Sequence, residues 1–163
     1  MIKIFYFNFC PAVLHCCSLA NIKKIESVQK RAIGYIYNDY VSSYEELREW
    51  GNKPLLYVHR IKLILLEVYK IVNMLGPEYL HEMFLVYDSA YEVRNFMNIV
   101  MPKFNTLKYI KNSISYTGVK LWNILNTETK QTINIKVFRR FIMLWNGPTR
   151  SCFNCTHCSL KYK

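Results

Sequence analysis

The stretch from Pro54 to Leu75 constrains the fold of this chain most. It is apolar around most of its circumference, and a helix without a polar face has to be buried. Proline suits the first position of a helix, while Gly76 and Pro77 supply a C-cap residue and a residue that cannot continue the helix. Its most apolar part, Ile61–Leu75, carries three charged residues and is too short to span a membrane. We therefore expect a buried central helix.

Two shorter helices are predicted before it. Between Asn21 and Tyr37, one apolar stripe recurs at steps of three and four, at Ile22, Ile25, Val28, Ala32 and Ile36. Asn38-Asp39 is expected to end that helix. Ser43 and Glu46 match a capping box, which predicts a second helix to about Trp50. Four cations fall off the stripe and are interpreted as a solvated face: Lys23, Lys24, Lys30 and Arg31.

The elements after the central helix are shorter. Pro77–Phe84 and Gly118–Leu125 are predicted to be short helices, and strands are expected around Ile99–Met101 and Leu107–Tyr116. The last helix should cover Ile135–Trp145, with Asn134 as N-cap. Its predicted buried face consists of Ile135, Phe138, Phe141, Ile142 and Trp145, and the opposite side carries Lys136, Arg139 and Arg140.

These elements predict a mainly α-helical protein. Residues 1–90 form a helical part around the buried central helix, residues 91–147 a small, irregular and basic α+β part, and residues 148–163 a flexible, Cys-containing tail.

The charge is distributed unevenly between these parts. Lys and Arg number 22 against 11 Asp and Glu, which gives a net charge of +11. Residues 1–93 hold 10 of each sign, so the whole excess lies in residues 94–163, where Glu128 is the one acid. A basic, aromatic-rich stretch favours RNA or DNA as partner, although a solvated surface is the alternative. The candidate phosphate contacts are Arg94, Lys103, Lys108, Lys111, Lys120, Lys136, Arg139 and Arg140.

The six cysteines form two clusters separated by 134 residues without cysteine, which favours reduced thiols inside the cell, in nucleus or cytoplasm. Cys152, Cys155 and Cys158 have the residue types of a zinc site at short spacing. The alternatives are free thiols in the tail and a redox pair. Zinc is the one cofactor that the sequence suggests, and neither a membrane nor a small-molecule substrate is expected.

Phosphoryl-transfer chemistry of the two-metal kind needs carboxylates that together hold two metal ions. The chain has two aspartates, Asp39 and Asp88, and they stand 49 positions apart. We therefore expect no catalysis by this chain alone.

Four short blocks resemble a known family when they are taken together and in order. They are Gln-Lys-Arg-Ala (29–32), Ser-Ser-Tyr-Glu-Glu-Leu (42–47), Lys-Leu-Trp-Asn (120–123) and Trp-Asn-Gly-Pro-Thr (145–149). This series resembles the region after the polymerase core in non-LTR retrotransposon reverse transcriptases of the jockey and CR1 type. The resemblance implies RNA-directed DNA polymerase ancestry, a nucleic-acid partner, and contact with the rest of a reverse transcriptase in a longer protein.

The chain departs from that family's pattern at Leu14, Arg48, Asn126 and Arg150. These departures leave two alternatives to a nucleic-acid-binding fragment. One is an inert remnant of a decayed transposon copy, and the other is an interaction module adopted by the host.

Overall fold

The computed structural model describes residues 11–15, 17–51, 56–86, 97–103 and 113–145, and in these residues the protein is mainly α-helical. The elements, in chain order, are α1 (Pro11–His15), α2 (Leu19–Tyr37), α3 (Tyr44–Trp50), α4 (Leu56–Val72), the 3₁₀ helix η2 (Glu78–Met83), α6 (Ile114–Ile124), α7 (Thr127–Lys130) and α8 (Ile135–Leu144). The predicted helical character is thereby confirmed.

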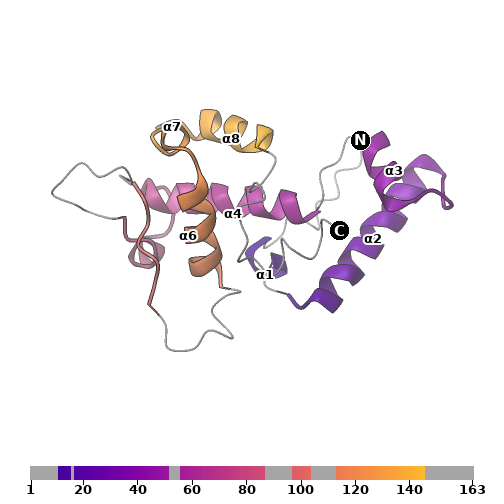
Figure 1. The fold of residues 1–163 in the computed structure, drawn as a ribbon, viewed down its shortest axis with the longest axis horizontal. Helices are drawn as coiled ribbons and strands as arrows, with labels where there is room; N and C mark the ends of the chain where they lie inside the picture. Colours follow the sequence, from indigo (N-terminus) through magenta and orange to yellow (C-terminus); the bar gives the residue numbers. More distant parts are fainter. Residues whose placement is uncertain (1–10, 16, 52–55, 87–96, 104–112, 146–163) are drawn as a thin grey trace.

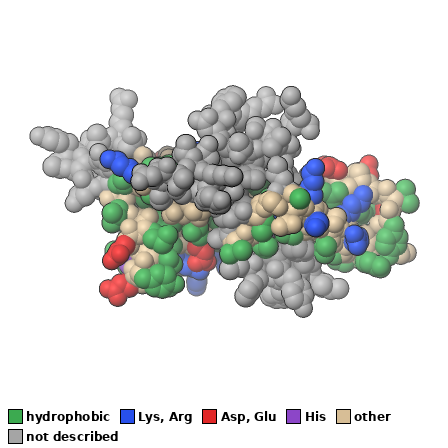
Figure 2. All heavy atoms as spheres, turned by 90° about the horizontal axis from the view of Figure 1, so that it is seen from below, with side chains coloured by type: hydrophobic (Ala, Val, Ile, Leu, Met, Phe, Trp, Pro, Cys, Tyr) green, Lys and Arg blue, Asp and Glu red, His purple; other side chains and the backbone are tan. Residues whose placement is uncertain are grey.

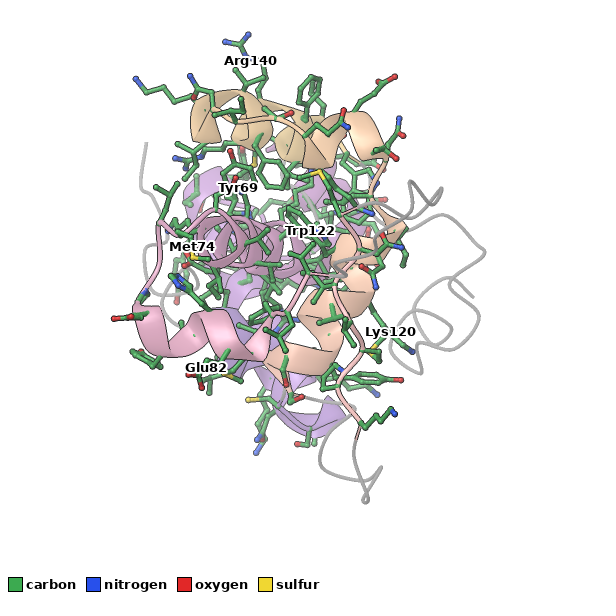
Figure 3. The ribbon with its side chains drawn as sticks, turned by 90° about the vertical axis from the view of Figure 1, so that its left-hand side faces the viewer. Tyr69, Met74, Glu82, Lys120, Trp122 and Arg140 are labelled. Carbon is green, nitrogen blue, oxygen red and sulfur yellow. The ribbon has the colours of Figure 1, made fainter. Side chains whose placement is uncertain are left out.

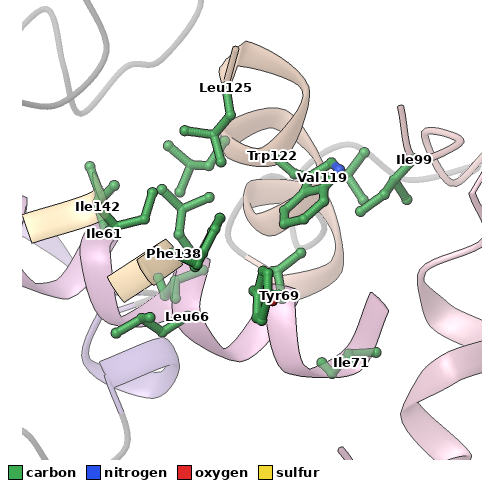
Figure 4. Close-up of a cluster of buried hydrophobic side chains, with 14 of the residues drawn as sticks. Ile61, Leu66, Tyr69, Ile71, Ile99, Val119, Trp122, Leu125, Phe138 and Ile142 are labelled. Carbon is green, nitrogen blue, oxygen red and sulfur yellow. The ribbon is translucent and has the colours of Figure 1, made fainter. Parts of the chain in front are cut away.

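Helix α4 is the centre of the structure, as predicted. Twelve of its residues are buried, and it contacts α1, α6, α8 and η2 (Figure 1). The core that forms around it draws residues from both sides of residue 90 (Figure 4). An apolar helix of this kind is stable only when neighbours cover it on several sides, and helices that follow it in the chain supply much of this cover.

Three aromatic rings join α4, α6 and α8 at the middle of the core. Tyr69 stacks on Phe138 with ring centroids 4.1 Å apart, and Trp122 lies 6.5 Å from Tyr69 and 6.0 Å from Phe138 (Figure 4). The Tyr69 hydroxyl donates a hydrogen bond of 2.7 Å to the carbonyl of Thr132. The buried polar tip is therefore satisfied, and it ties α4 to the turn before α8.

The predicted end of α4 at Leu75, with Gly76 as cap, is wrong, because the helix stops at Val72. Met74 adopts φ 57° and takes the left-handed position that a glycine was expected to hold. Its N–H donates to the Ile71 carbonyl (3.1 Å), and the Leu75 N–H donates to the Lys70 carbonyl (2.7 Å). This pair of bonds is the Schellman pattern, which satisfies the last carbonyls of a helix.

Helices α2 and α3 pack against each other and form a projecting hairpin, residues 19–50, hereafter the arm (Figure 1). Two of its helix ends agree with prediction, since Asn38 is the left-handed C-cap of α2 and Ser43 and Glu46 form the capping box. The predicted stripe of α2 is partly wrong, because Val28 and Ile36 are exposed.

The buried face of α2 instead combines Ile22 of the predicted stripe with Gln29 and Ile33, which lie outside it. Tyr44 of α3 donates a hydrogen bond of 2.6 Å to the Gln29 side-chain oxygen. The contact with α3 thus decides which side of α2 is covered, and a polar glutamine lies on that side because its oxygen has a partner there.

No strand is formed in the described residues, where one isolated antiparallel bridge joins Val86 and Ile99. The strand expected over Leu107–Tyr116 is wrong from residue 114 onward, because those residues begin α6, and residues 107–112 lie outside the described part. The Asn123 side chain accepts from the Ile99 N–H (2.9 Å) and donates to the Ile99 carbonyl (3.0 Å). One side-chain amide thus supplies the two hydrogen bonds that a neighbouring strand would have made.

Candidate nucleic-acid interface

Helix α8 forms as the sequence predicts and presents its cations to solvent. The Asn134 side-chain oxygen caps it by accepting the Lys136 N–H at 2.8 Å. Phe138 and Ile142 are fully buried against the core. Lys136, Arg139 and Arg140 are exposed, and Figure 3 shows Arg140 pointing away from the body of the protein. The expectation that the three cations face outward together is confirmed.

The position of α8 depends on a buried lysine of α4. Lys62 is 6% exposed and donates a hydrogen bond of 2.7 Å from Nζ to the carbonyl of Met143, in the last turn of α8. A cation there interacts favourably with the negative end of the helix dipole and satisfies a terminal carbonyl. Burial lowers the pKa of Lys62. This role of Lys62 could not be predicted from the sequence, where it is one charge within an apolar stretch.

Among the residues that the structure describes, no carboxylate forms an ion pair with the cations of α8. The helix contains no acid, and within the described ranges the one ion pair joins Lys70 and Glu67 of α4. Lys136, Arg139 and Arg140 therefore form a compact group of positive charge on one helix, three and four residues apart.

The predicted apolar face of α8 is wrong at Phe141, which is 49% exposed. Val137 and Leu144 are exposed as well, at 39% and 74%. The contact with α4 rests on Phe138 and Ile142, with Ile135 and Trp145 partly buried beside them. The elements that contact α8, chiefly α4 with α7 and Trp122 of α6, cover only one side of it, so the remaining apolar residues reach solvent.

Two other candidate phosphate contacts that the structure describes, Lys120 and Lys103, lie on other segments of the chain. Lys120 lies on α6, away from α8, and its Nζ is 4.7 Å from the centroid of the Tyr116 ring (Figure 3). Lys103 is exposed at the end of the segment 97–103, in which the Ile99 carbonyl accepts a hydrogen bond from the Asn123 side chain. Arg94, Lys108 and Lys111 lie outside the described residues. Of the five candidates that the structure describes, three are thus brought together, and α8 carries all three.

One lysine of the basic part has a structural role instead. Lys130 is 4% exposed, and its Nζ donates to the Asn98 side-chain oxygen (2.7 Å) and to the Asn123 carbonyl (3.4 Å). Burial lowers its pKa. Together with the bond of 2.9 Å from Trp122 Nε1 to the Met97 carbonyl, it holds residues 97–99 against α6.

A second group of exposed cations lies on the arm. Lys23, Lys24 and Arg31 of α2 are exposed, and Figure 2 shows Lys and Arg side chains among hydrophobic ones on this part of the surface, with carboxylates at its edge. Glu45, Glu46 and Glu49 of α3 provide negative charge on the same hairpin. The arm therefore carries both signs, unlike α8.

The proposed zinc ligands Cys152, Cys155 and Cys158 lie outside the described residues. In the part that the structure does describe, no three His, Cys, Asp or Glu side chains are grouped so that they could hold a metal ion. No described helix combines the length and apolarity needed to cross a membrane.

Comparison with known proteins found no relative of this chain. No family model, no curated protein and no solved structure matches the chain.

Proposed function

We propose that this chain binds RNA or DNA without sequence preference through the exposed cations of α8. We further propose that it is a non-catalytic C-terminal fragment of a non-LTR retrotransposon reverse transcriptase, which acts beside the rest of that enzyme in nucleus or cytoplasm. The observation that carries the binding proposal is the group formed by Lys136, Arg139 and Arg140, exposed together on a helix that contains no acid. The family proposal rests on the four sequence blocks.

The chemistry of such binding is electrostatic. Each phosphate that a lysine or arginine neutralises releases condensed counterions, so the logarithm of affinity falls linearly with the logarithm of salt concentration. The slope is about −0.7 per phosphate on a single strand and about −0.9 on a duplex. Guanidinium groups such as those of Arg139 and Arg140 also match phosphate geometry with two parallel hydrogen bonds.

Replacing Lys136, Arg139 and Arg140 together with glutamine should flatten that salt slope by roughly two to three units. Stability should barely change, because the three side chains are exposed and Phe138 and Ile142 stay in the core. Fluorescence anisotropy with labelled oligonucleotides at several salt concentrations measures the slope, and a thermal melt checks the fold.

The matched control replaces Lys23, Lys24 and Arg31 of the arm with glutamine, which removes the same net charge from exposed positions. It should leave the slope nearly unchanged. If the two triple variants lose the same slope, the binding follows net charge and not the α8 face. If the parent protein binds no nucleic acid and also fails to fold, the inert-remnant alternative is the better one.

We expect no primer extension on an RNA template with Mg²⁺ or Mn²⁺. Asp39 is engaged in the turn of the arm, where its side chain accepts from the N–H groups of Val41 (2.9 Å) and Ser42 (3.0 Å). Hydrogen bonds from Ser42, first from its side chain and then from its backbone, lower the pKa of this carboxyl. Asp88 lies outside the described residues. Extension by rigorously purified protein would contradict the non-catalytic proposal.

A second candidate function is protein interaction through the arm, in line with a host-adopted module. Tyr35, Tyr40, Val41 and Trp50 are each at least 60% exposed, and grouped apolar surface of this kind marks interaction sites. The charges of both signs on the arm favour a second copy of the chain as partner. Light scattering should then report a dimer that Val41→Asp disrupts, and a monomeric parent at high concentration would exclude this candidate.

A further inference from the structure

We infer that the α8 site selects single-stranded over double-stranded nucleic acid, because α8 exposes an apolar stripe beside its cations. This inference rests on the proposed nucleic-acid binding. The stripe consists of Val137, Phe141 and Leu144, which are 39%, 49% and 74% exposed. The sequence predicted that Phe141 would be buried, so the stripe is visible only in the folded protein.

The two stripes run side by side along the helix. Residues 137, 141 and 144 follow the spacing i, i+4, i+7, which places them on one side of a helix. At 100° per residue, Arg140 and Leu144 lie next to each other at the boundary, with Lys136 and Arg139 farther round. Phe138 and Ile142 occupy the remaining, buried side. The solvent-facing surface of α8 thus has an apolar half and a mainly cationic half, in which Met143, 37% exposed, lies between Arg139 and Lys136.

A single strand has the same division. Its phosphates line one edge, and its unpaired bases present flat, largely apolar faces along the other. Cations that track the backbone, together with aromatic side chains on which bases stack, are the usual elements of single-strand binding sites. Phe141 would supply the stacking face, and Val137 and Leu144 would extend the apolar contact. A duplex buries its base faces in the stack, so it can use the cations but not the stripe.

A helix of another protein, with apolar residues along one side, is the alternative partner for such a stripe. The positive charge next to the stripe favours a polyanion, because α8 contributes no acid and the cations have no ion-pair partner in the part of the chain described by the structure. A nucleic acid matches both halves of the helix at once.

The test compares Phe141→Ala with the parent protein on a single-stranded oligonucleotide and on the duplex of the same sequence. Loss of one stacked base should weaken single-strand binding about 5- to 150-fold, since stacking contributes about 1–3 kcal/mol per base. Duplex binding should change less than about twofold, and the salt slope should stay the same, because every cation remains. Phe141→Trp should retain the single-strand affinity. Tyr79→Ala removes an exposed aromatic ring from η2 and serves as the control, with no effect on either substrate.

The outcomes separate this inference from the function on which it rests. If the Lys136, Arg139 and Arg140 variant loses slope on both substrates but Phe141→Ala changes neither, α8 binds phosphates and the single-strand inference is wrong. Equal losses on single strand and duplex with Phe141→Ala also overturn it. If the cation variant keeps its full slope, the proposed function itself fails. A stripe variant that keeps its nucleic-acid affinity but shifts the mass measured by light scattering would assign the stripe to a protein partner.

Discussion

Leu65→Glu should lower the free energy of unfolding by several kcal/mol, a large fraction of the total for a protein of ordinary stability. Leu65 is fully buried in the middle of α4, among residues of the same core cluster. A carboxylate there would lose its hydration without gaining a partner, or it would have to stay protonated, and either outcome is costly. Urea unfolding followed by circular dichroism measures the loss.

The control is Leu85→Glu, the same change at a side chain that is 64% exposed. It should shift stability by no more than about 0.5 kcal/mol. If the two variants unfold at the same urea concentration, α4 is not the centre of the core. The effect of Leu65→Glu should also extend to α8, because α8 rests on α4 and would lose its support when the core opens.

Trp122→Ala should cost about 3–5 kcal/mol, the range for truncating a buried large aromatic side chain. Trp122 is fully buried beside the stacked rings of Tyr69 and Phe138. The variant loses that packing, and it also leaves the Met97 carbonyl without the bond of 2.9 Å from Nε1. Thermal and urea unfolding should both report the loss.

Trp50→Ala provides the comparison, because Trp50 is 60% exposed at the end of α3 and meets Tyr37 only edge-to-face, with ring centroids 6.4 Å apart. Its cost should be well below that of Trp122→Ala. Trp122→Phe should fall between the parent and Trp122→Ala, since it keeps most of the apolar volume and loses the hydrogen bond. Equal costs for the two alanine variants would mean that Trp122 does not anchor the core.

Local signals in the sequence predicted the helices well where their chemistry is short-range. The capping box at Ser43 and Glu46 and the N-cap Asn134 form as expected, because each needs only backbone groups two or three residues away. The buried central helix was also predictable, because a segment without a polar face has no stable place in water. The outward cations of α8 follow from helical periodicity alone.

Two kinds of feature were missed, the residue at which a helix ends and the contacts that depend on neighbours distant in sequence. The end of α4 is set by Met74 in a left-handed conformation, a position for which composition favours the nearby Gly76. The segment around Ile99 has strand-like composition, yet beside one isolated bridge to Val86 the backbone of Ile99 is hydrogen-bonded to the side chain of Asn123, 24 residues later. The composition of a β-branched segment does not show whether another strand or an amide side chain will make the hydrogen bonds of its backbone.

The residues of the candidate site show the same difference between local features and features that depend on packing. The sequence by itself determined that the excess charge lies after residue 93 and that Lys136, Arg139 and Arg140 share one side of a helix. Only the tertiary structure decided that Lys62 holds the end of α8, that Lys130 is buried, and that Phe141 is exposed. Periodicity specifies which residues share a side, because that depends on the helix alone. The width of the buried strip of α8 depends on the shape of the surface on which the helix packs. The packing of α8 on α4 leaves Phe141 in solvent.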